Sequence, residues 1–375
     1  MEIYLFYALF SVFVLCFFVQ TYFIIAVQGK FSLKKLITTS NQTLTNSVSV
    51  IICARNERKN LALNLDFVLN QNYPNFEVIV VNDCSFDGSE DFLKEFLNRY
   101  PTKLKVVTIE EHPRHKTSKK FAATLGIKAA TNEILLFTDA DCKPESDNWI
   151  SKMVNHYQNP AIEIVLGCSP YQHKPGFLNK VIRYETFLTA INYFGFALWG
   201  MPYMGVGRNL SYKKSLFFKG KGFASHMHIP SGDDDLFVNQ HANKLNVALE
   251  YSFDAQTVSQ PKNTFVSYWI QKFRHLGAGK AYKSSHKAIL TLQFLSGLLF
   301  YFTLIGLILL KVAIVAVISI FFFRYILQLI FYYKGFLKLQ SKDLAWWIII
   351  TDPIYYIFTF ILGIFGLFKK KVRWK

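Results

Sequence analysis

Two aspartates, Asp139 and Asp141, stand at the end of an apolar run that begins at Ile134. The run predicts a buried strand, which would place both carboxylates at its C-terminal end. Carboxylate oxygens bind hard cations such as Mg²⁺ or Mn²⁺, and these cations are commonly shared with substrate phosphates. The same spacing also fits acidic caps of a loop or of the next helix. The surrounding elements must therefore decide between a metal site and a cap.

Strand-like and helix-like segments alternate upstream of this pair. Short runs rich in β-branched residues lie at 48–54, 76–81 and 106–109. Strands that alternate with helices indicate a parallel sheet, whose ligands bind outside the carboxyl ends of the strands. Residues 54–57 and Asp83 follow two of these runs, so we expect them at the same sheet edge as the aspartate pair.

A second acidic group occupies residues 233–235, directly before an apolar helical pattern that starts at Leu236. Adjacent carboxylates raise one another's pKa, which suits a general base and would equally suit a second cation. An acidic helix cap is the simpler alternative. The position downstream of the other acidic strand ends favours a base.

The ends of the chain have a different composition from its middle. Residues 3–27 are almost entirely apolar, long enough to cross a bilayer, and without the basic start and cleavage site of a signal peptide. A second apolar block runs from about residue 289 to 367. We therefore divide the chain as follows: an N-terminal transmembrane helix at 1–28, a basic linker at 29–46, a globular domain at 47–287, transmembrane or interfacial helices at 288–368, and a basic tail at 369–375.

The formal net charge of +17 is distributed beside these apolar segments. This pattern fits membrane lipids as a partner and cytoplasmic flanks, and no nucleic-acid module accompanies it. The odd number of scattered cysteines fits a reducing compartment. Basic residues on both flanks imply that one apolar segment does not cross fully. Our candidate is the last one, which Asp352 and Pro353 are expected to break; an interfacial helix at 324–338 is the alternative.

Five ordered motifs together resemble a known family. They are Val-Ser-Val-Ile-Ile-Cys-Ala-Arg-Asn-Glu at 48–57, Val-Ile-Val-Val-Asn-Asp-Cys-Ser at 78–85, Lys-Lys-Phe-Ala-Ala-Thr-Leu-Gly-Ile at 119–127, Phe-Thr-Asp-Ala-Asp at 137–141 and Ser-Gly-Asp-Asp-Asp-Leu at 231–236. The combination is similar to the membrane-associated family 2 glycosyltransferases, which are inverting enzymes. The resemblance implies an α/β domain of GT-A type with a mostly parallel central sheet, flanked by N- and C-terminal transmembrane helices.

The resemblance also implies roles for single residues. Those expected to bind the base, ribose and diphosphate of a nucleotide-sugar are Ala54, Arg55, Asn56, Glu57, Asp83 and Lys119. Asp141, and less directly Asp139, would hold the Mg²⁺ or Mn²⁺. Alignment on Leu236 makes Asp233 the catalytic base. The family's preceding glutamate is here Gly232, so a slip of one position would make Asp234 the base.

Two further segments resemble parts of the family that meet the acceptor or the diphosphate. Gly207 and Asn209 belong to a Gly-x-Asn element expected to line the acceptor cleft. Gln271 and Arg274 match an element of processive synthases in which these residues lie near the diphosphate. His275 replaces the tryptophan that stacks on the acceptor there, which argues against processive synthesis.

The sequence therefore predicts an inverting, metal-dependent hexosyltransferase-like enzyme, multi-pass in the cell membrane, with a cytoplasmic catalytic domain. Its donor would be a UDP- or GDP-sugar, and its acceptor a lipid-linked glycan or another membrane-proximal acceptor. The alternatives are a processive polysaccharide synthase and a non-catalytic membrane scaffold.

Overall fold

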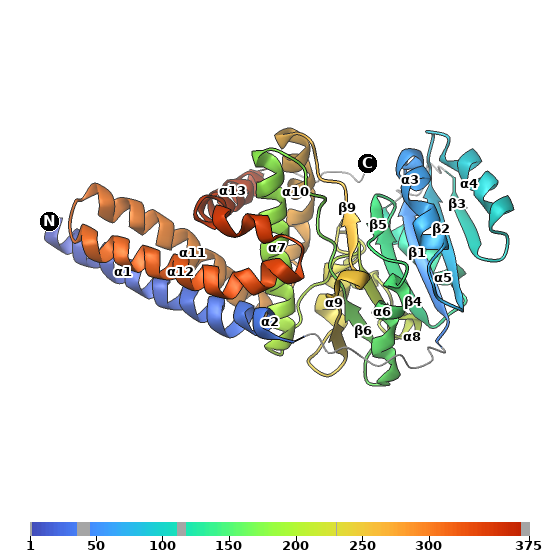
Figure 1. Ribbon diagram of the computed structural model, residues 1–375, viewed down its shortest axis with the longest axis horizontal. Coiled ribbons are helices and arrows are strands. Elements are labelled where there is room, and N and C mark those ends of the chain that lie inside the picture. The colour runs from blue at the N-terminus through green and yellow to red at the C-terminus, as the bar shows by residue number, and fades with distance from the viewer. Residues whose placement is uncertain (1, 36–45, 111–117, 230, 369–375) are drawn as a thin grey trace.

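The computed structural model describes residues 2–35, 46–110, 118–229 and 231–368. Figure 1 shows an elongated molecule with the sheet at one end and long helices at the other. A layer containing α7 (Phe177–Leu198) and α10 (Phe265–Gly279) lies between them. The cavity discussed below is lined by residues of this layer and of the sheet edge.

In the described part of the chain, the main sheet has seven strands in the order β3-β2-β1-β4-β7-β6-β8. The strands are β1 (Val48–Ala54), β2 (Phe76–Asp83), β3 (Leu104–Ile109), β4 (Ile134–Asp139), β6 (Ile164–Leu166), β7 (Leu210–Lys213) and β8 (Val247–Leu249). Strand β7 is antiparallel to both of its neighbours, and the other pairs are parallel. The predicted α/β fold with a mostly parallel sheet is confirmed. A separate antiparallel pair joins β5 (Cys142–Pro144) to β9 (Thr257–Ser259).

Alternation along β1 explains why helices cover both faces of this sheet. Val50 and Ile52 point into a core shared with α3 (Arg58–Leu69), α4 (Ser89–Arg99) and α6 (Trp149–Val154). Ile51, between them, points into the opposite core with α5 (Lys119–Ala129) and α7. A strand that is apolar on both sides is buried on both sides, as expected for the centre of a parallel sheet. Two short helices, α8 (Lys214–Lys219) and α9 (Asp235–His241), complete the domain.

Among the described residues, four helical segments are long and apolar enough to cross a membrane: residues 4–33, 284–309, 314–338 and 342–366. The first comprises α1 (Glu2–Tyr22), a π-helical stretch (Phe23–Gln28) and α2 (Gly29–Leu33). The others contain α11 (Ser284–Leu309), α12 (Ile314–Lys338) and α13 (Ile348–Phe368). The structure thus supports a membrane protein. The domain boundaries predicted from the sequence remain predictions.

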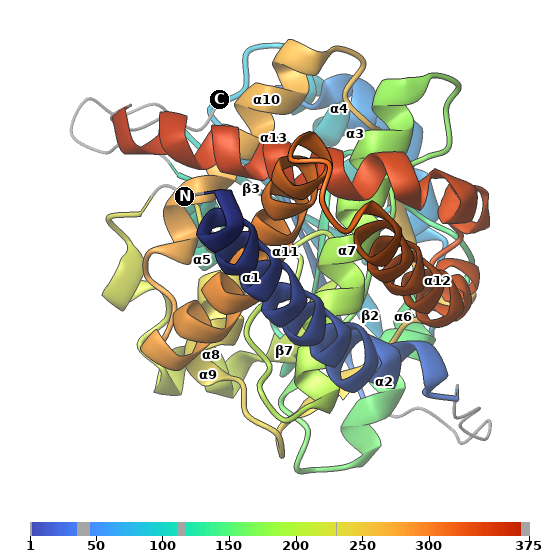
Figure 2. The same cartoon turned by 90° about the vertical axis from the view of Figure 1, so that its left-hand side faces the viewer.

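Helix α13 differs from the other long helices in direction. Figure 1 and Figure 2 show α1, α11 and α12 running side by side, whereas α13 lies across them next to α7 and α10. The expectation that Asp352 and Pro353 break this helix is wrong, because α13 continues through Pro353. Asp352 is buried but paired with Arg324 at 3.1 Å, and the hydroxyl of Tyr184 donates to it at 2.6 Å. This pairing offsets the cost of burying an acid between helices.

Candidate functional site

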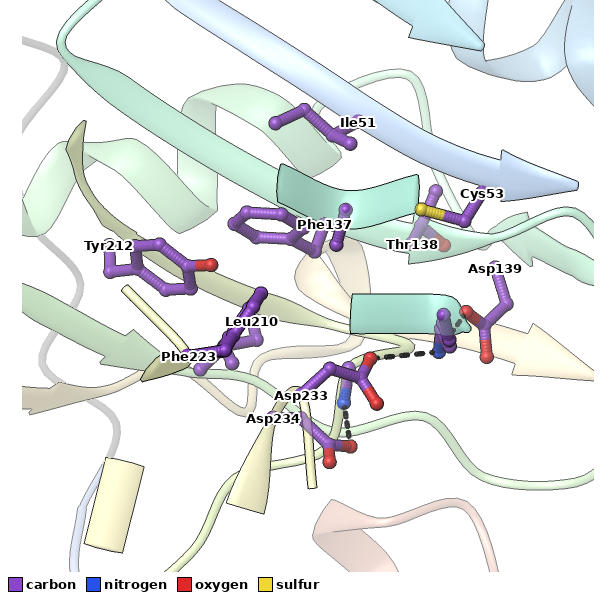
Figure 3. A pocket seen from close by; sticks show the side chains of 13 residues that line it. Ile51, Cys53, Phe137, Thr138, Asp139, Leu210, Tyr212, Phe223, Asp233 and Asp234 are labelled. Carbon is purple, nitrogen blue, oxygen red and sulfur yellow. Dashed lines mark hydrogen bonds and ion pairs between the residues drawn. The ribbon is translucent and has the colours of Figure 1, made fainter. Parts of the chain in front are cut away.

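The carboxyl ends of β1, β2 and β4 meet at one edge of the sheet. Cys53 pairs in register with Asp139, and Ala54 pairs with Asn82, the residue before Asp83. This register places the ends of the predicted motifs side by side, as the βαβ pattern required. Figure 3 shows Asp139 at this edge, with the carboxylate of Asp233 directed toward it and that of Asp234 turned away.

Lys119 joins two of the predicted functional groups. Its Nζ donates to an Oδ of Asp139 at 2.8 Å and lies 3.3 Å from an Oδ of Asp233. The residue starts α5, whose N-terminus is capped by the Ser118 hydroxyl. Burial alone would lower the pKa of Lys119, but the charges of Asp139 and Asp233 outweigh it and hold the pKa well above its usual value. Lys119 is therefore a fixed cation between the predicted metal ligand and the predicted base.

Asp139 and Asp141 both line a cavity at the sheet edge. Burial would raise the pKa of Asp139, but Lys119, followed by Arg208 and Arg274, holds it below its usual value. Within the described residues, no three His, Cys, Asp or Glu side chains gather into a metal site. The two carboxylates suit a hard cation that takes its remaining ligands from a substrate and water.

The acidic residues 233–235 have separate partners. Asp234 caps α9 and accepts hydrogen bonds from the backbone N–H groups of Gly207 at 2.6 Å and Asp235 at 2.7 Å. Asp235 accepts from the hydroxyl of Tyr282 at 2.8 Å. Burial, and then the charge of Asp234, raises the pKa of Asp235 to about 7. Asp233 is the member that faces Lys119, an arrangement that favours Asp233 over Asp234 as the base.

The residues expected to bind the nucleotide surround the ends of β1 and β2. A guanidinium nitrogen of Arg55 lies 3.9 Å from the fully buried carboxylate of Asp83, and burial raises the pKa of Asp83. Asn56 adopts a left-handed conformation, with φ of 56°, and its side-chain oxygen accepts from the N–H of Phe86 at 3.0 Å. Glu57 lines the cavity. Asn56 therefore shapes the turn that presents its neighbours.

Two of the three residues predicted for the acceptor side, Gly207 and Asn209, are placed differently from each other. Gly207 lines the cavity, and a Cβ atom there would lie 3.2 Å from the carboxylate of Asp234, so a side chain would crowd that contact. Asn209 is fully buried: it accepts from the Trp149 indole at 3.0 Å and donates to the carbonyls of Cys168 and Ala255 at 2.8 and 2.7 Å. Such an amide braces the loops behind the site. Its placement favours a structural role, and an acceptor contact is not supported.

Helix α10 closes the cavity on the side away from the sheet. Gln271, Arg274 and His275 all line it, and Gln271 donates to the hydroxyl of Tyr171 at 3.0 Å. Desolvation by the surrounding atoms, followed by the charges of Lys272 and Arg274, lowers the pKa of His275, although the residue is exposed. A neutral imidazole is therefore expected where related synthases carry tryptophan.

The cavity has a volume of ≈ 650 Å³ and extends well beyond the carboxylates. From Asp139 and Asp233 it continues between α7 and α10 to α13, where Phe358 and Leu362 line it. A single continuous space thus connects the polar sheet edge with one of the apolar helices.

Sequence reasoning missed residues whose roles depend on tertiary contacts. Arg208 stands on the cavity wall with its guanidinium 4.4 Å from the ring of Tyr171. Lys120 is fully buried and donates to the carbonyls of His226 at 2.6 Å and Ile229 at 3.0 Å, which tethers the loop before Asp233. A lysine on the inner face of a helical pattern was the available signal for Lys120. The only sequence signal for Arg208 was its position within the Gly-x-Gly-Arg-Asn segment.

A comparison with known protein families identifies the family of residues 49–224. The family model described as glycosyl transferase family 2 matches residues 49–224. These residues form a family 2 glycosyltransferase domain. The family 2 domain contains the aspartate pair, Lys119 and Arg208, while the acidic residues 233–235 lie just beyond the matched segment.

Curated relatives share this part of the chain. Glycosyltransferase AglE from Haloferax volcanii is 30% identical over 142 residues, which are 37% of this chain and 44% of the relative. A poly-beta-1,6-N-acetyl-D-glucosamine synthase from Staphylococcus epidermidis is 27% identical over 158 residues, 42% of this chain and 37% of the relative. The chain therefore spans less than half the length of these two relatives.

The whole chain also has a structural neighbour. The mannosyltransferase PcManGT from Pyrobaculum calidifontis, solved in complex with GDP-Man and Mn²⁺, matches 96% of this chain and 98% of its own length with a TM-score of 0.57 and 19% identity. At this identity the similarity shows a shared fold, with the flanking helices included.

Proposed function

We propose that this protein transfers a sugar from a nucleotide-sugar, with inversion, to a lipid-linked or membrane-proximal acceptor at the cytoplasmic face of the membrane. The observation that carries the proposal is the continuous cavity from the carboxylates of Asp139 and Asp233 to helix α13. A donor bound at the sheet edge and an acceptor arriving beside an apolar helix would meet in this space.

The donor assignment rests on the family and on the sheet edge. Arg55, Glu57 and Asp83 lie where open α/β sheets bind nucleotides. The structural neighbour's complex with GDP-Man makes a GDP-sugar one concrete candidate, and a UDP-sugar is the other.

Asp139 and Asp141 are the residues that would hold Mg²⁺ or Mn²⁺. Their oxygen donors suit either ion, and the neighbour's complex contains Mn²⁺. When bound, such a cation would neutralise negative charge on the diphosphate leaving group. Lys119 already partly neutralises Asp139 and would lie close to the same phosphates.

Asp233 is the proposed general base. In this reaction its carboxylate takes the proton of an acceptor hydroxyl, whose oxygen forms a bond to the anomeric carbon of the donor. The bond between that carbon and the phosphate oxygen breaks at the same time, and its electron pair leaves with the nucleoside diphosphate. Attack from the face opposite the leaving group inverts the anomeric configuration. The ion pair with Lys119, at 3.3 Å, orients the carboxylate of Asp233 beside the sheet edge.

The acceptor would approach from the membrane. Helices α7, α10 and α13 lie across the direction of α1, α11 and α12, as expected of helices along a membrane surface (Figure 1, Figure 2). Large apolar side chains are exposed on α10 and α13, including Val266, Ile270 and Phe365. With α1, α11 and α12 crossing and α13 lying at the interface, both the globular domain and the C-terminal end would face the cytoplasm, in agreement with the positive-inside rule.

The test is a transfer assay on the purified full chain in detergent with Mn²⁺ and a panel of radiolabelled UDP- and GDP-sugars. Extracted membrane lipids serve as the acceptor source. We expect one donor to give a labelled product that extracts with lipid and carries a single added sugar. A ladder of long products would instead support the processive alternative. Failure of every donor to be hydrolysed or transferred would favour the scaffold alternative.

A further inference from the structure

Arg208 lies in the turn before β7 and has an incompletely satisfied guanidinium. The group stacks on the ring of Tyr171, with 4.4 Å between Cζ and the ring centroid. Its Nη1 atom is buried, and no atom of the described residues accepts a hydrogen bond from it. A buried charged donor without an acceptor costs free energy, so the arrangement indicates a group that a ligand completes.

Arg183 is a second arginine of the cavity, and the protein supplies hydrogen-bond acceptors for its guanidinium. Arg183 donates to both carboxylate oxygens of Asp343 at 2.6 and 2.7 Å, and to the carbonyl of Gln340 at 3.2 Å. Both arginines line the same cavity. Arg183 therefore has protein acceptors for the bonds that Arg208 offers to the cavity.

The support beneath Arg208 keeps it in place. Tyr171 is buried, and its hydroxyl accepts a hydrogen bond from Gln271 of α10 at 3.0 Å. Stacking on a fixed ring limits the rotamers of the guanidinium and leaves its edge free for planar recognition. Gln271 thus acts on the site through Tyr171.

The charges around Arg208 identify the class of ligand. Arg208 and Arg274, the latter on α10, line the same cavity as the proposed cation ligands Asp139 and Asp141. A group that meets both arginines and a carboxylate-bound cation must itself be strongly anionic and rich in oxygen, which describes a phosphate.

We propose that Arg208, together with Arg274, forms a phosphate subsite on the α10 side of Asp139 and Asp141. The ligand is a phosphoryl group, either of the nucleotide-sugar or of a phosphate carried by the membrane acceptor. The inference deepens the proposed function and rests on it for the source of the phosphate. Arg208 is the new element, since neither the sequence motifs nor the family resemblance assigns it a role.

Equilibrium binding to the purified full chain in detergent with Mn²⁺ tests the subsite. The probes are UDP and GDP, with uridine and guanosine as their phosphate-free counterparts, and decyl phosphate with decanol as its counterpart. Each is titrated calorimetrically against wild type, Arg208→Gln and Arg208→Lys. Arg183→Lys is the matched control, because that arginine lines the same cavity but is satisfied by Asp343. Melting temperatures without ligand check that each variant is folded.

We expect Arg208→Gln to weaken the binding of at least one phosphate probe about tenfold or more, the range for losing a hydrogen bond to a charged group. Arg208→Lys, which keeps the charge and loses the planar fork, should fall between Arg208→Gln and wild type. The phosphate-free probes should be unaffected. A loss confined to UDP or GDP assigns the subsite to the donor, and a loss confined to decyl phosphate assigns it to the acceptor.

The proposal is overturned if folded Arg208→Gln and Arg208→Lys bind every phosphate probe within about twofold of wild type. It is also overturned if Arg183→Lys loses as much affinity as Arg208→Gln, or if wild type binds no phosphate probe. Because binding needs no turnover, this result is separate from the transfer assay. A chain without transferase activity can still show an Arg208-dependent phosphate site.

Discussion

The Nζ atom of Lys119 lies 3.3 Å from a carboxylate oxygen of Asp233, so an ion pair joins the start of α5 to the acidic turn before α9. The same ammonium lies 2.8 Å from Asp139 at the end of β4. Three segments that are far apart in the sequence therefore share one cation. Under the proposed function, a donor phosphate would compete with both carboxylates for Lys119, so we expect their charges to rearrange together when the donor binds.

The pH dependence of stability should reflect the protonation of Asp235. Its pKa is raised to about 7 in the folded protein, mainly by burial and then by Asp234, against about 4 for an aspartate in an unfolded chain. The folded state then binds more protons than the unfolded state between these values. The contribution of Asp235 to stability is therefore fully present below about pH 4 and is lost as pH rises through about 7.

Asp235→Asn should flatten this dependence. We expect the wild-type melting temperature to fall between pH 5 and 8, for a loss of about 2–3 kcal/mol in stability, and the variant to change much less over the same range. Melting temperatures of the full chain in detergent provide the measurement. Equal slopes for the two proteins would show that Asp235 does not titrate in this window.

Lys120 should position the loop that precedes the proposed base. Lys120→Met removes its hydrogen bonds to the carbonyls of His226 and Ile229. The His226 carbonyl keeps its bond from the N–H of Ile229, whereas the Ile229 carbonyl loses the lysine donor. We expect a loss of about 1–3 kcal/mol in stability and a lower transfer rate with little change in donor affinity. The matched control is Lys128→Met, because Lys128 is exposed on the same helix. If both variants lose activity equally, the tether has no special role.

The ion pair between Arg324 and Asp352 should connect α13 to the long helices. Asp352→Asn leaves the guanidinium of Arg324, which is 1% exposed, without its charged partner. We expect the single variant to lose about 3 kcal/mol or more. The double variant Arg324→Gln with Asp352→Asn should recover part of that loss. Additive losses in a double-mutant cycle of melting temperatures would show that the two residues are not coupled.

The orientation of α13 predicts on which side of the membrane the C-terminus lies. If α13 lies along the interface, a reporter fused after Lys375 faces the cytoplasm, and one fused after Leu310 faces the other side. In a bacterial host, green fluorescent protein should be fluorescent at the first position, and alkaline phosphatase active at the second. Active alkaline phosphatase after Lys375 would mean that α13 crosses the membrane.

The sheet and its edge were predictable because each strand carries its own signal. The apolar runs that became β1, β2 and β4 end in Asp83, Asp139 and other polar residues, and strand order in βαβ units brings such ends together. The acidic turn could be placed by its motif. These inferences needed only local pattern and a topological rule.

The remaining features depend on contacts that no local pattern shows. Asn209 resembled an acceptor contact, but its amide is saturated by Trp149 and two carbonyls inside the fold. Asp352 next to a proline indicated a helix break until its partner Arg324, 28 residues earlier, was known. The position of the Arg208 guanidinium in the cavity depends on its stacking on Tyr171. In each case, the role of a polar residue depends on a tertiary partner that is distant in the sequence.

Asp233 is proposed as the base of a nucleotide-sugar transfer whose donor is held at Asp139 and Asp141. The most direct test measures transfer and Mn²⁺-dependent donor binding in parallel for Asp233→Asn and Asp141→Asn. We predict that Asp233→Asn lowers the transfer rate by about 100-fold or more while donor affinity stays within a few fold, and that Asp141→Asn loses donor binding. Transfer by Asp233→Asn at close to the wild-type rate would contradict the account.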